Sequence, residues 1–306
     1  MREKVLVTGS DGFIATHLLE ELKRRGYLVR RFDIWSDPAQ DVRDPWAVSE
    51  AVQDCRFIIH TAASPYIPHC YVAPKLFFDT NAVGTLNLLI ASKNLDIERF
   101  IYYSSSEIYG TAQQQKMNET HPLNPHSLYA VSKLAGDRLC YSFYREHGVP
   151  VTILRQFNCF GSHETHPYII PEIIEQLNKN KGKLYLGNIG AERDFLYVED
   201  AALACIDIME SDKMVGEVIN IGSGISHSIE SIARLIGRIM GFDDVEICVD
   251  KNRLRPYDVD KLVCDNSKIR RLIGWRPVTS FEDGLKRTIE WFHENGDKWN
   301  YRRGRT

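Results

Sequence analysis

Long apolar runs are absent from this sequence, and so is a strong excess of charge of either sign. No apolar stretch reaches the roughly 18 residues that a membrane helix requires. The formal net charge is −3, which gives no support to nucleic-acid binding. The N-terminus leads directly into a strand-like segment, without the pattern of a signal peptide. We therefore expect a cytoplasmic location and neither a membrane nor a nucleic acid as partner.

Paired cysteines and clustered metal ligands are lacking as well. The chain has seven cysteines, an odd number, and no Cys-x-x-Cys pair, which argues against a disulfide framework and a cysteine zinc site. His163 and His166 are three residues apart, but no neighbouring set of cysteine or acidic residues completes a metal site. Glu164, between them, would face the other way on a helix. We therefore expect reduced thiols and no metal.

The composition is that of a globular protein with an ample core. The chain has 306 residues, of which 43% are hydrophobic and 26% charged. In the first half, strand-like segments alternate with amphipathic helical ones, which predicts right-handed crossovers and a parallel sheet. The predicted strands are Lys4–Thr8, Leu28–Phe32, Phe57–His60, Arg99–Ser104 and Val151–Arg155, and the predicted helices are Phe13–Arg25, Asn81–Lys93 and Ser127–His147.

The alternation loosens after about Phe160, which suggests a second, smaller unit. Val218–Ile221 is expected to return as a further strand of the main sheet. The predicted helices of this half are Pro167–Asn178, Val198–Glu210, Ser228–Met240, Asn266–Leu272 and Phe281–Asn295, and Lys183–Leu186 is extended. We predict a cofactor domain over residues 1–160, joined again by about 193–225, and a lobe formed mainly by 161–306.

A glycine-containing turn connects the first strand to the first helix. Gly9 and Gly12 allow a tight turn and a close approach of the backbone to a pyrophosphate, and the helix that follows supplies free N–H groups at Phe13 and Ile14. Ala15 takes the third small position, which is compact enough for packing of helix on strand. In this context the turn predicts a dinucleotide site within a doubly wound α/β fold of Rossmann type.

An acidic residue ends the second strand. Asp33 lies about 20 residues beyond the turn, where a carboxylate hydrogen-bonds the adenosine ribose and favours NAD over NADP. Arg30 and Arg31 on the same strand could serve a 2′-phosphate, so the pattern leaves NADP open. Asp41 and Val42 could border the adenine.

Tyr129 and Lys133 are four residues apart on a predicted helix. They therefore share one face of that helix. A lysine ammonium beside a phenol favours the phenolate, so Tyr129 is a candidate base.

Several motifs, in order along the chain, resemble the extended short-chain dehydrogenase/reductases, and within them the nucleotide-sugar epimerases and dehydratases. Ala15 replaces the usual third glycine. The resemblance implies NAD, a nucleotide-sugar substrate and a cofactor site that includes Thr61, Ala62 and Ala63. The motifs are Gly9-x-x-Gly12-x-x-Ala15, His60-Thr61-Ala62-Ala63, Asn81-Ala82-Val83-Gly84-Thr85, Ser104-Ser105-Ser106-Glu107-Ile108-Tyr109-Gly110, Tyr129-x-x-x-Lys133 and Arg193-Asp194-Phe195-x-x-Val198-x-Asp200.

The same resemblance implies roles for the catalytic residues. Ser105 would bind the sugar O4, Tyr129 would take the O4 proton, and Lys133 would bind the nicotinamide ribose and lower the pKa of the phenol. Glu107 would take the C5 proton that a 4,6-dehydratase must remove. The triplet that ends in Glu107 resembles the Thr-Ser-Glu of GDP-mannose 4,6-dehydratases. In dTDP-glucose 4,6-dehydratases an aspartate, the proposed acid for water loss, stands where this chain has Ser106.

Three other functions remain open at this point. A plain 4-epimerase of this fold needs no second base, and simple 4-epimerases usually have a small or hydroxyl residue at the place of Glu107. UDP-glucuronate decarboxylases share the triplet but need a cation for the substrate carboxylate, which no residue clearly supplies. A regulatory protein that binds NAD without catalysis often lacks the tyrosine or the lysine, and both are present here.

The resemblance also assigns the substrate side. Phe157 would border the nicotinamide, Asn158 would bind the diphosphate, and Arg193 and Arg255 would meet its charge, since a guanidinium donates paired hydrogen bonds. His69 could line the substrate cleft. Related proteins commonly form homodimers through the helices that correspond to Asn81–Lys93 and Ser127–His147, and we expect exposed Leu88, Leu139 and Phe143 to take part.

Overall fold

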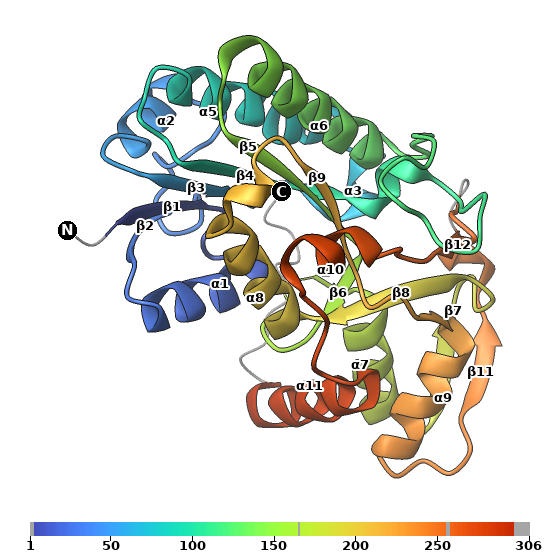
Figure 1. The fold of residues 1–306 in the computed structure, drawn as a ribbon. Coiled ribbons are helices and arrows are strands. Elements are labelled where there is room, and N and C mark those ends of the chain that lie inside the picture. The colour runs from blue at the N-terminus through green and yellow to red at the C-terminus, as the bar shows by residue number, and fades with distance from the viewer. Residues whose placement is uncertain (1–2, 165, 255–257, 297–306) are drawn as a thin grey trace.

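A parallel sheet with helices on both faces forms the larger part of the protein. The computed structural model describes residues 3–164, 166–254 and 258–296. Its main sheet has six strands in the order β2-β1-β3-β4-β5-β9, and all neighbouring pairs are parallel (Figure 1). The strands are β1 Lys4–Thr8, β2 Leu28–Phe32, β3 Phe57–His60, β4 Arg99–Ser105, β5 Val151–Gln156 and β9 Val218–Ile221.

The strand order creates a topological switch point beside β1. From β1 the chain moves outward to β2 and then returns to β3 on the other side of β1. Crossovers leave in opposite directions here, so a crevice opens at the carboxyl ends of β1 and β3, where α/β proteins bind ligands. The predicted Rossmann-type sheet is confirmed, and so is the return of β9 to it.

Two helical layers cover the sheet. In Figure 1 α5 and α6 lie above it, and α1 and α8 lie below it. Leu18 and Leu22 of α1 and the buried face of α8 pack on one side, while Leu88, Leu89 and Cys140 pack on the other. The helices are α1 Phe13–Arg24, α2 Pro45–Ala51, α3 Ile67–Cys70, α4 Pro74–Phe78, α5 Gly84–Ser92, α6 Leu128–His147, α8 Val198–Met209 and α10 Ser267–Ile273.

The helix predicted over Asn81–Lys93 begins earlier than its periodicity indicated. A π-helical turn, Asp79–Val83, joins α4 to α5 without a break. This turn presents Asn81, whose side chain accepts from the Ser64 N–H at 2.7 Å and donates to the Ser132 hydroxyl at 2.9 Å. The wider turn thus ties this helix to α6, which carries the candidate base, in keeping with the tendency of π-turns to occur at functional sites.

The smaller lobe has its own core and its own short strands. Helices α7 and α9 contact each other, α11 packs beside them, and isoleucines of α7 and α9 fill the space between (Figure 1). Most ladders of this lobe join strands far apart in the chain, and most of these strands were not predicted. Its elements are β6 Asn158–Phe160, α7 Ile169–Asn180, β7 Lys183–Leu186, β8 Glu192–Tyr197, β10 Ser226–Ser228, α9 Ile229–Ile239, β11 Glu246–Val249, β12 Lys261–Leu262 and α11 Phe281–Asn295.

None of the helices in the described ranges combines the length and the apolar character needed to cross a bilayer.

Candidate active site

A large cleft lies at the carboxyl edge of the main sheet and extends into the smaller lobe. Its volume is about 1390 Å³. Typical pockets for one small ligand measure about 300–1,000 Å³, so this cleft has room for two. It brings together every described residue that the sequence suggested for the site. These are Gly9, Gly12, Phe13, Ile14, Asp33, Asp41, Val42, Thr61, Ala62, Ala63, Ser105, Ser106, Glu107, Tyr129, Lys133, Phe157, Asn158 and Arg193.

The glycine turn at one end of the cleft is shaped by close backbone contact. Gly9 has φ of 67°, and a Cβ there would lie 2.7 Å from the backbone of Ala62, so only glycine fits without displacement. Gly12 precedes α1 and has no side chain to cap it. The N–H groups of the first helical turn therefore stay available to an anionic ligand.

The carboxylate of Asp33 is held in place at the end of β2. One oxygen accepts from the Asp11 N–H and the other from the Trp35 N–H, both at 2.8 Å. Arg31 pairs with Asp11, and Arg30 donates to backbone carbonyls at the end of α2, at 2.7 Å to Ala51. Each of the two arginines that left NADP open thus has a partner within the protein, and the Asp33 carboxylate suits a ribose diol better than a 2′-phosphate.

The other predicted cofactor residues have structural partners as well. Asp41 pairs with Arg43 at 2.6 Å. Val42 packs closely against Gly84, since a Cβ added to Gly84 would lie 2.7 Å from the Val42 side chain. The Thr61 hydroxyl donates to the Thr8 carbonyl at 2.6 Å. Together with the open first turn of α1, these groups form a cradle that fits a dinucleotide.

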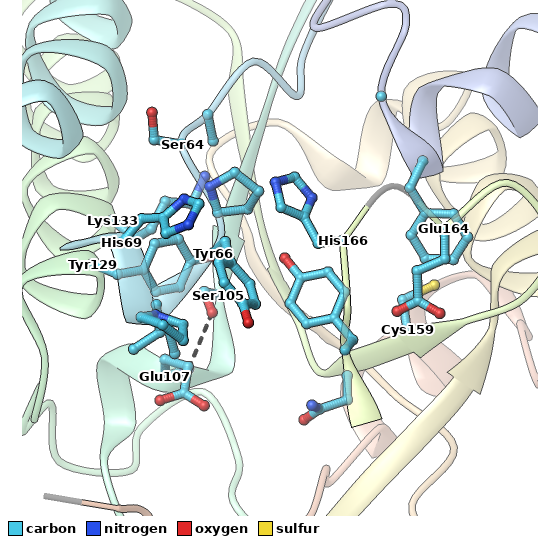
Figure 2. A pocket seen from close by; sticks show the side chains of 18 of the residues that line it. Ser64, Tyr66, His69, Ser105, Glu107, Tyr129, Lys133, Cys159, Glu164 and His166 are labelled. Atoms are coloured by element: carbon cyan, nitrogen blue, oxygen red, sulfur yellow. Dashed lines mark hydrogen bonds between the residues drawn. The ribbon is translucent and has the colours of Figure 1, made fainter. Parts of the chain in front are cut away.

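The triplet after β4 turns its side chains in different directions. Ser105 precedes a 3-10 turn, and its hydroxyl accepts from the Glu107 N–H at 3.2 Å, the contact dashed in Figure 2. Ser106 is only 2% exposed, whereas Glu107 is half-buried. The Ser105 hydroxyl and the Glu107 carboxylate both act on the pKa of the Tyr129 phenol, which places these three groups within electrostatic reach of one another.

Tyr129 and Lys133 are positioned by the start and the packing of α6. The Ser127 hydroxyl caps the helix by accepting from the Ala130 N–H at 3.1 Å. Gly136 lets α6 approach β4, because a Cβ there would lie 2.3 Å from the Tyr102 hydroxyl. That hydroxyl donates to the Lys133 carbonyl at 3.1 Å. The positions of Tyr129 and Lys133 are therefore fixed by the Ser127 cap of α6 and by the close contact of Gly136 with Tyr102.

The electrostatics of the pair differ from what the sequence suggested. Burial raises the pKa of Tyr129 to about 12, the Ser105 hydroxyl opposes this rise, and Glu107 adds to it. Burial lowers the pKa of Lys133 to about 8, with Asp137 opposing. Lys133 is not among the groups that shift the pKa of the phenol. Burial therefore dominates the pKa of the phenol here, and the lowering by Lys133 stays an expectation from the family resemblance.

A buried polar network lies behind the catalytic helix, and the sequence did not reveal it. Asp137, fully buried and one turn beyond Lys133, accepts from Arg155 at 2.9 Å and from the Ser104 hydroxyl at 3.1 Å. Burial alone would raise the pKa of Asp137, but Arg155 and Arg138 outweigh it and keep that pKa low. Removing one partner of such a buried pair typically costs about 3–5 kcal/mol. This network ties α6 to β4 and β5.

On the substrate side, the structure gives Arg193 an anionic neighbour. Arg193 is 7% exposed, lines the cleft with Asn158, and approaches Asp258 at 3.2 Å. Asp258 in turn accepts from Asn188 at 3.2 Å. Arg255, the second predicted diphosphate ligand, lies outside the described residues. No group of three or more potential metal ligands occurs within the described ranges.

Several cleft residues were not predicted. Glu164 is 2% exposed, and burial holds its pKa well above the usual range. It lines the cleft together with His166, whereas His163 is exposed and packs on Trp291 with ring centroids 4.7 Å apart. The segment is not helical, so the expectation that Glu164 faces away from both histidines does not hold. Tyr66 also lines the cleft, near the expected His69.

Comparisons with known proteins agree with this geometry. The sequence pattern of the family described as GDP-mannose 4,6 dehydratase matches residues 36–288. The human dTDP-D-glucose 4,6-dehydratase is 29% identical, over 97% of this chain and 92% of its own length. The low-salt glycan biosynthesis protein Agl12 of Haloferax volcanii is 32% identical, over 82% of this chain and 80% of its own length. UDP-glucuronic acid decarboxylase 1 of Danio rerio is 28% identical, over 95% of this chain and 73% of its own length.

Solved structures show the same fold, and one of them has NAD bound. The dTDP-glucose 4,6-dehydratase DesIV of Streptomyces venezuelae, solved with NAD bound, has a TM-score of 0.88 at 27% identity, covering 97% of this chain and 99% of its own. An epimerase from Methanothermobacter thermautotrophicus has a TM-score of 0.90 at 26% identity, covering 97% and 94%. The chain therefore belongs to the GDP-mannose 4,6-dehydratase family, within the extended short-chain dehydrogenase/reductases, and is an NAD-dependent nucleotide-sugar enzyme.

Proposed function

We propose that the protein is a nucleotide-sugar 4,6-dehydratase that converts a nucleotide hexose to its 4-keto-6-deoxy form. The observation that carries this proposal is Glu107, a carboxylate that lines the cleft within electrostatic reach of Tyr129 and Ser105. A plain 4-epimerase has no need of a second base at this place. Water loss across C5 and C6 does need one.

The chemistry divides between the cofactor and the residues of the chain. The glycine turn and Asp33 would hold NAD, which would supply oxidation at C4 and reduction at C6, with a proton returned to C5. Ser105 would hold O4, and Tyr129 would take its proton. The resulting 4-ketone acidifies C5, so that Glu107 can take the C5 proton while the C6–O bond breaks and hydroxide leaves as water. Because Ser106 replaces an aspartate and is buried, Glu107 or a water would also protonate the leaving hydroxyl.

The diphosphate of the substrate would lie at the other end of the cleft. Asn158 and Arg193 line that part, and Arg193 is already oriented by Asp258. The Arg193 guanidinium also donates to the Glu192 carbonyl at 3.0 Å, and we expect it to meet phosphate oxygens through paired hydrogen bonds. We include Arg255 in this role on the family resemblance alone.

A decarboxylase is the second candidate, and one observation favours it. The sequence offered no clear cation for a substrate carboxylate, but the structure places His69 and His166 in the cleft. An imidazole N–H at either position could donate to the carboxylate of a uronate. This candidate would act on UDP-glucuronate and release carbon dioxide.

The product mass separates these functions. We expect that incubation of the NAD-loaded enzyme with dTDP-glucose, GDP-mannose and UDP-glucose gives a product lighter by one water from at least one of them, by mass spectrometry. An unchanged mass with an inverted carbon would identify an epimerase. Loss of carbon dioxide from UDP-glucuronate, with no water loss from any hexose, would identify the decarboxylase.

We also propose a homodimer formed through α5 and α6. The residues named from the sequence need correction: Leu88 is buried in the core, and Leu139 and Phe143 are partly buried against it. Other apolar residues are exposed instead, namely Val83 just before α5 and Ile90, Leu128, Val131 and Tyr141 on these helices. We expect twice the monomer mass in sedimentation equilibrium, and an Ile90→Lys/Val131→Lys double variant should shift this mass to that of the monomer.

We propose a cytoplasmic location, because all seven cysteines are free thiols in the structure and free thiols are typical of a reducing compartment.

A further inference from the structure

Aromatic rings from both parts of the molecule meet inside the cleft. Tyr66 and His69 come from the segment that contains α3, on the side of the main sheet, and His166 and Tyr168 precede α7 in the lobe. All of them line the cleft. They are partly exposed, so that a ligand can reach them. We call this group the aromatic bridge.

Tyr66 is the centre of the aromatic bridge. Its ring stacks on His166 with centroids 5.5 Å apart and planes at 24°. It meets His69 edge-on at 4.8 Å and Tyr168 edge-on at 5.9 Å. These distances are typical of favourable aromatic pairs. Contacts from both sides therefore restrict the position of the Tyr66 ring.

The aromatic bridge lies next to the reacting groups. The Tyr129 ring packs against Ile67 and Cys70 of α3, the helix that directly follows Tyr66 and carries His69. In Figure 2 Tyr66 projects between Ser105 and Tyr129 on one side and His166 on the other. We therefore expect a hexose whose C4 hydroxyl reaches Ser105 and Tyr129 to lie beside the Tyr66 ring.

The proposed function gives this contact a consequence. Once the 4-ketone has formed, water loss across C5 and C6 leaves the sugar in one orientation. Inversion at C4 instead requires the sugar to turn and present its opposite face before the hydride is returned there. A ring held from both lobes and packed against the sugar opposes this turn, because an aromatic face packs against the C–H face of a sugar in a particular orientation.

We propose that Tyr66 is a specificity-determining residue that holds the hexose in one orientation and so commits the 4-keto intermediate to water loss rather than to inversion at C4. This proposal rests on the proposed function for its chemistry. The contact with the sugar itself does not depend on which reaction follows.

The test compares variants of Tyr66 in the NAD-loaded enzyme. Tyr66→Ala should weaken binding of the nucleotide hexose about tenfold in calorimetry and leave binding of the matching nucleoside diphosphate unchanged. Its product should contain the C4-inverted nucleotide sugar, resolved by NMR, which the wild type does not form. Tyr66→Phe keeps the ring and should bind the hexose as the wild type does and form no C4-inverted product. His166→Ala removes the stacking partner of Tyr66, so it should also weaken hexose binding and form some C4-inverted product.

Trp46→Ala is the matched control, because it removes a large aromatic that is 82% exposed and does not line the cleft. Equal weakening of the hexose and of the nucleoside diphosphate would show that the ring supports the lobe rather than the sugar, and would overturn the proposal. So would an unaltered product. If the wild type loses no water from any hexose, the proposed function fails, and the binding contrast alone then decides whether Tyr66 contacts the sugar.

Discussion

Tyr129→Phe should lower kcat by about 10³-fold while NAD binding stays at the wild-type level. The substitution removes one oxygen and leaves the ring, which packs against Ile67, Cys70 and Phe77 and helps to shape this side of the cleft. Without the phenol, no group of the chain at this position can take the O4 proton as C4 is oxidised. Turnover is measured by product formation, and NAD affinity is measured by calorimetry.

The control for this variant lies on the same helix. Tyr141 of α6 is 45% exposed, and Tyr141→Phe should keep the wild-type kcat. A kcat of Tyr129→Phe within tenfold of the wild type would remove the phenol from the chemistry. A wild-type protein that binds NAD yet transforms no nucleotide sugar would instead indicate a cofactor-binding regulatory protein.

Glu107→Gln should block water loss by about 10²–10⁴-fold without blocking oxidation at C4. Glutamine keeps the size of the side chain but cannot take the C5 proton. Ser105 and Tyr129 remain in place, so the 4-ketone still forms and reduced nicotinamide accumulates. The absorbance of the reduced nicotinamide in a single turnover measures oxidation at C4, and the mass of the product measures water loss.

A surface carboxylate provides the comparison. Glu230→Gln on α9 removes a carboxylate whose side chain is 45% exposed and pairs with Arg234 at 2.8 Å, and it should behave as the wild type. Water loss at the wild-type rate in Glu107→Gln would exclude Glu107 from the mechanism. Loss of C4 oxidation as well would mean that the carboxylate binds the sugar rather than takes a proton.

Local patterns predicted the fold of the first half well. The segments β1 and β3 are short, largely apolar runs, β2 is a short run that also carries Arg30 and Arg31, and the structure has all three with the predicted bounds. The predictions were poorer in the lobe, where β8 joins β6, β10 and β12. These ladders depend on partners far away in the chain, and a short strand carries no local sign of such a partner.

The same contrast holds within the site. Gly9, Asp33, Tyr129 and Lys133 could be named because each sits at a set distance from a strand end or on one helical face. Tyr66 could not, because its importance depends on His166, which reaches it from the lobe.

The sequence by itself determined the parallel sheet, the dinucleotide turn and the residues expected to do the chemistry, because periodicity and spacing act over a few residues. Only the tertiary structure decided the environment of those residues. It buried Tyr129 and Lys133 and so shifted their pKa values in opposite directions. It also engaged Arg30 at the end of α2, paired Arg31 with Asp11, and brought His166 into the cleft. Burial and contact depend on where distant segments pack, and no local pattern encodes that.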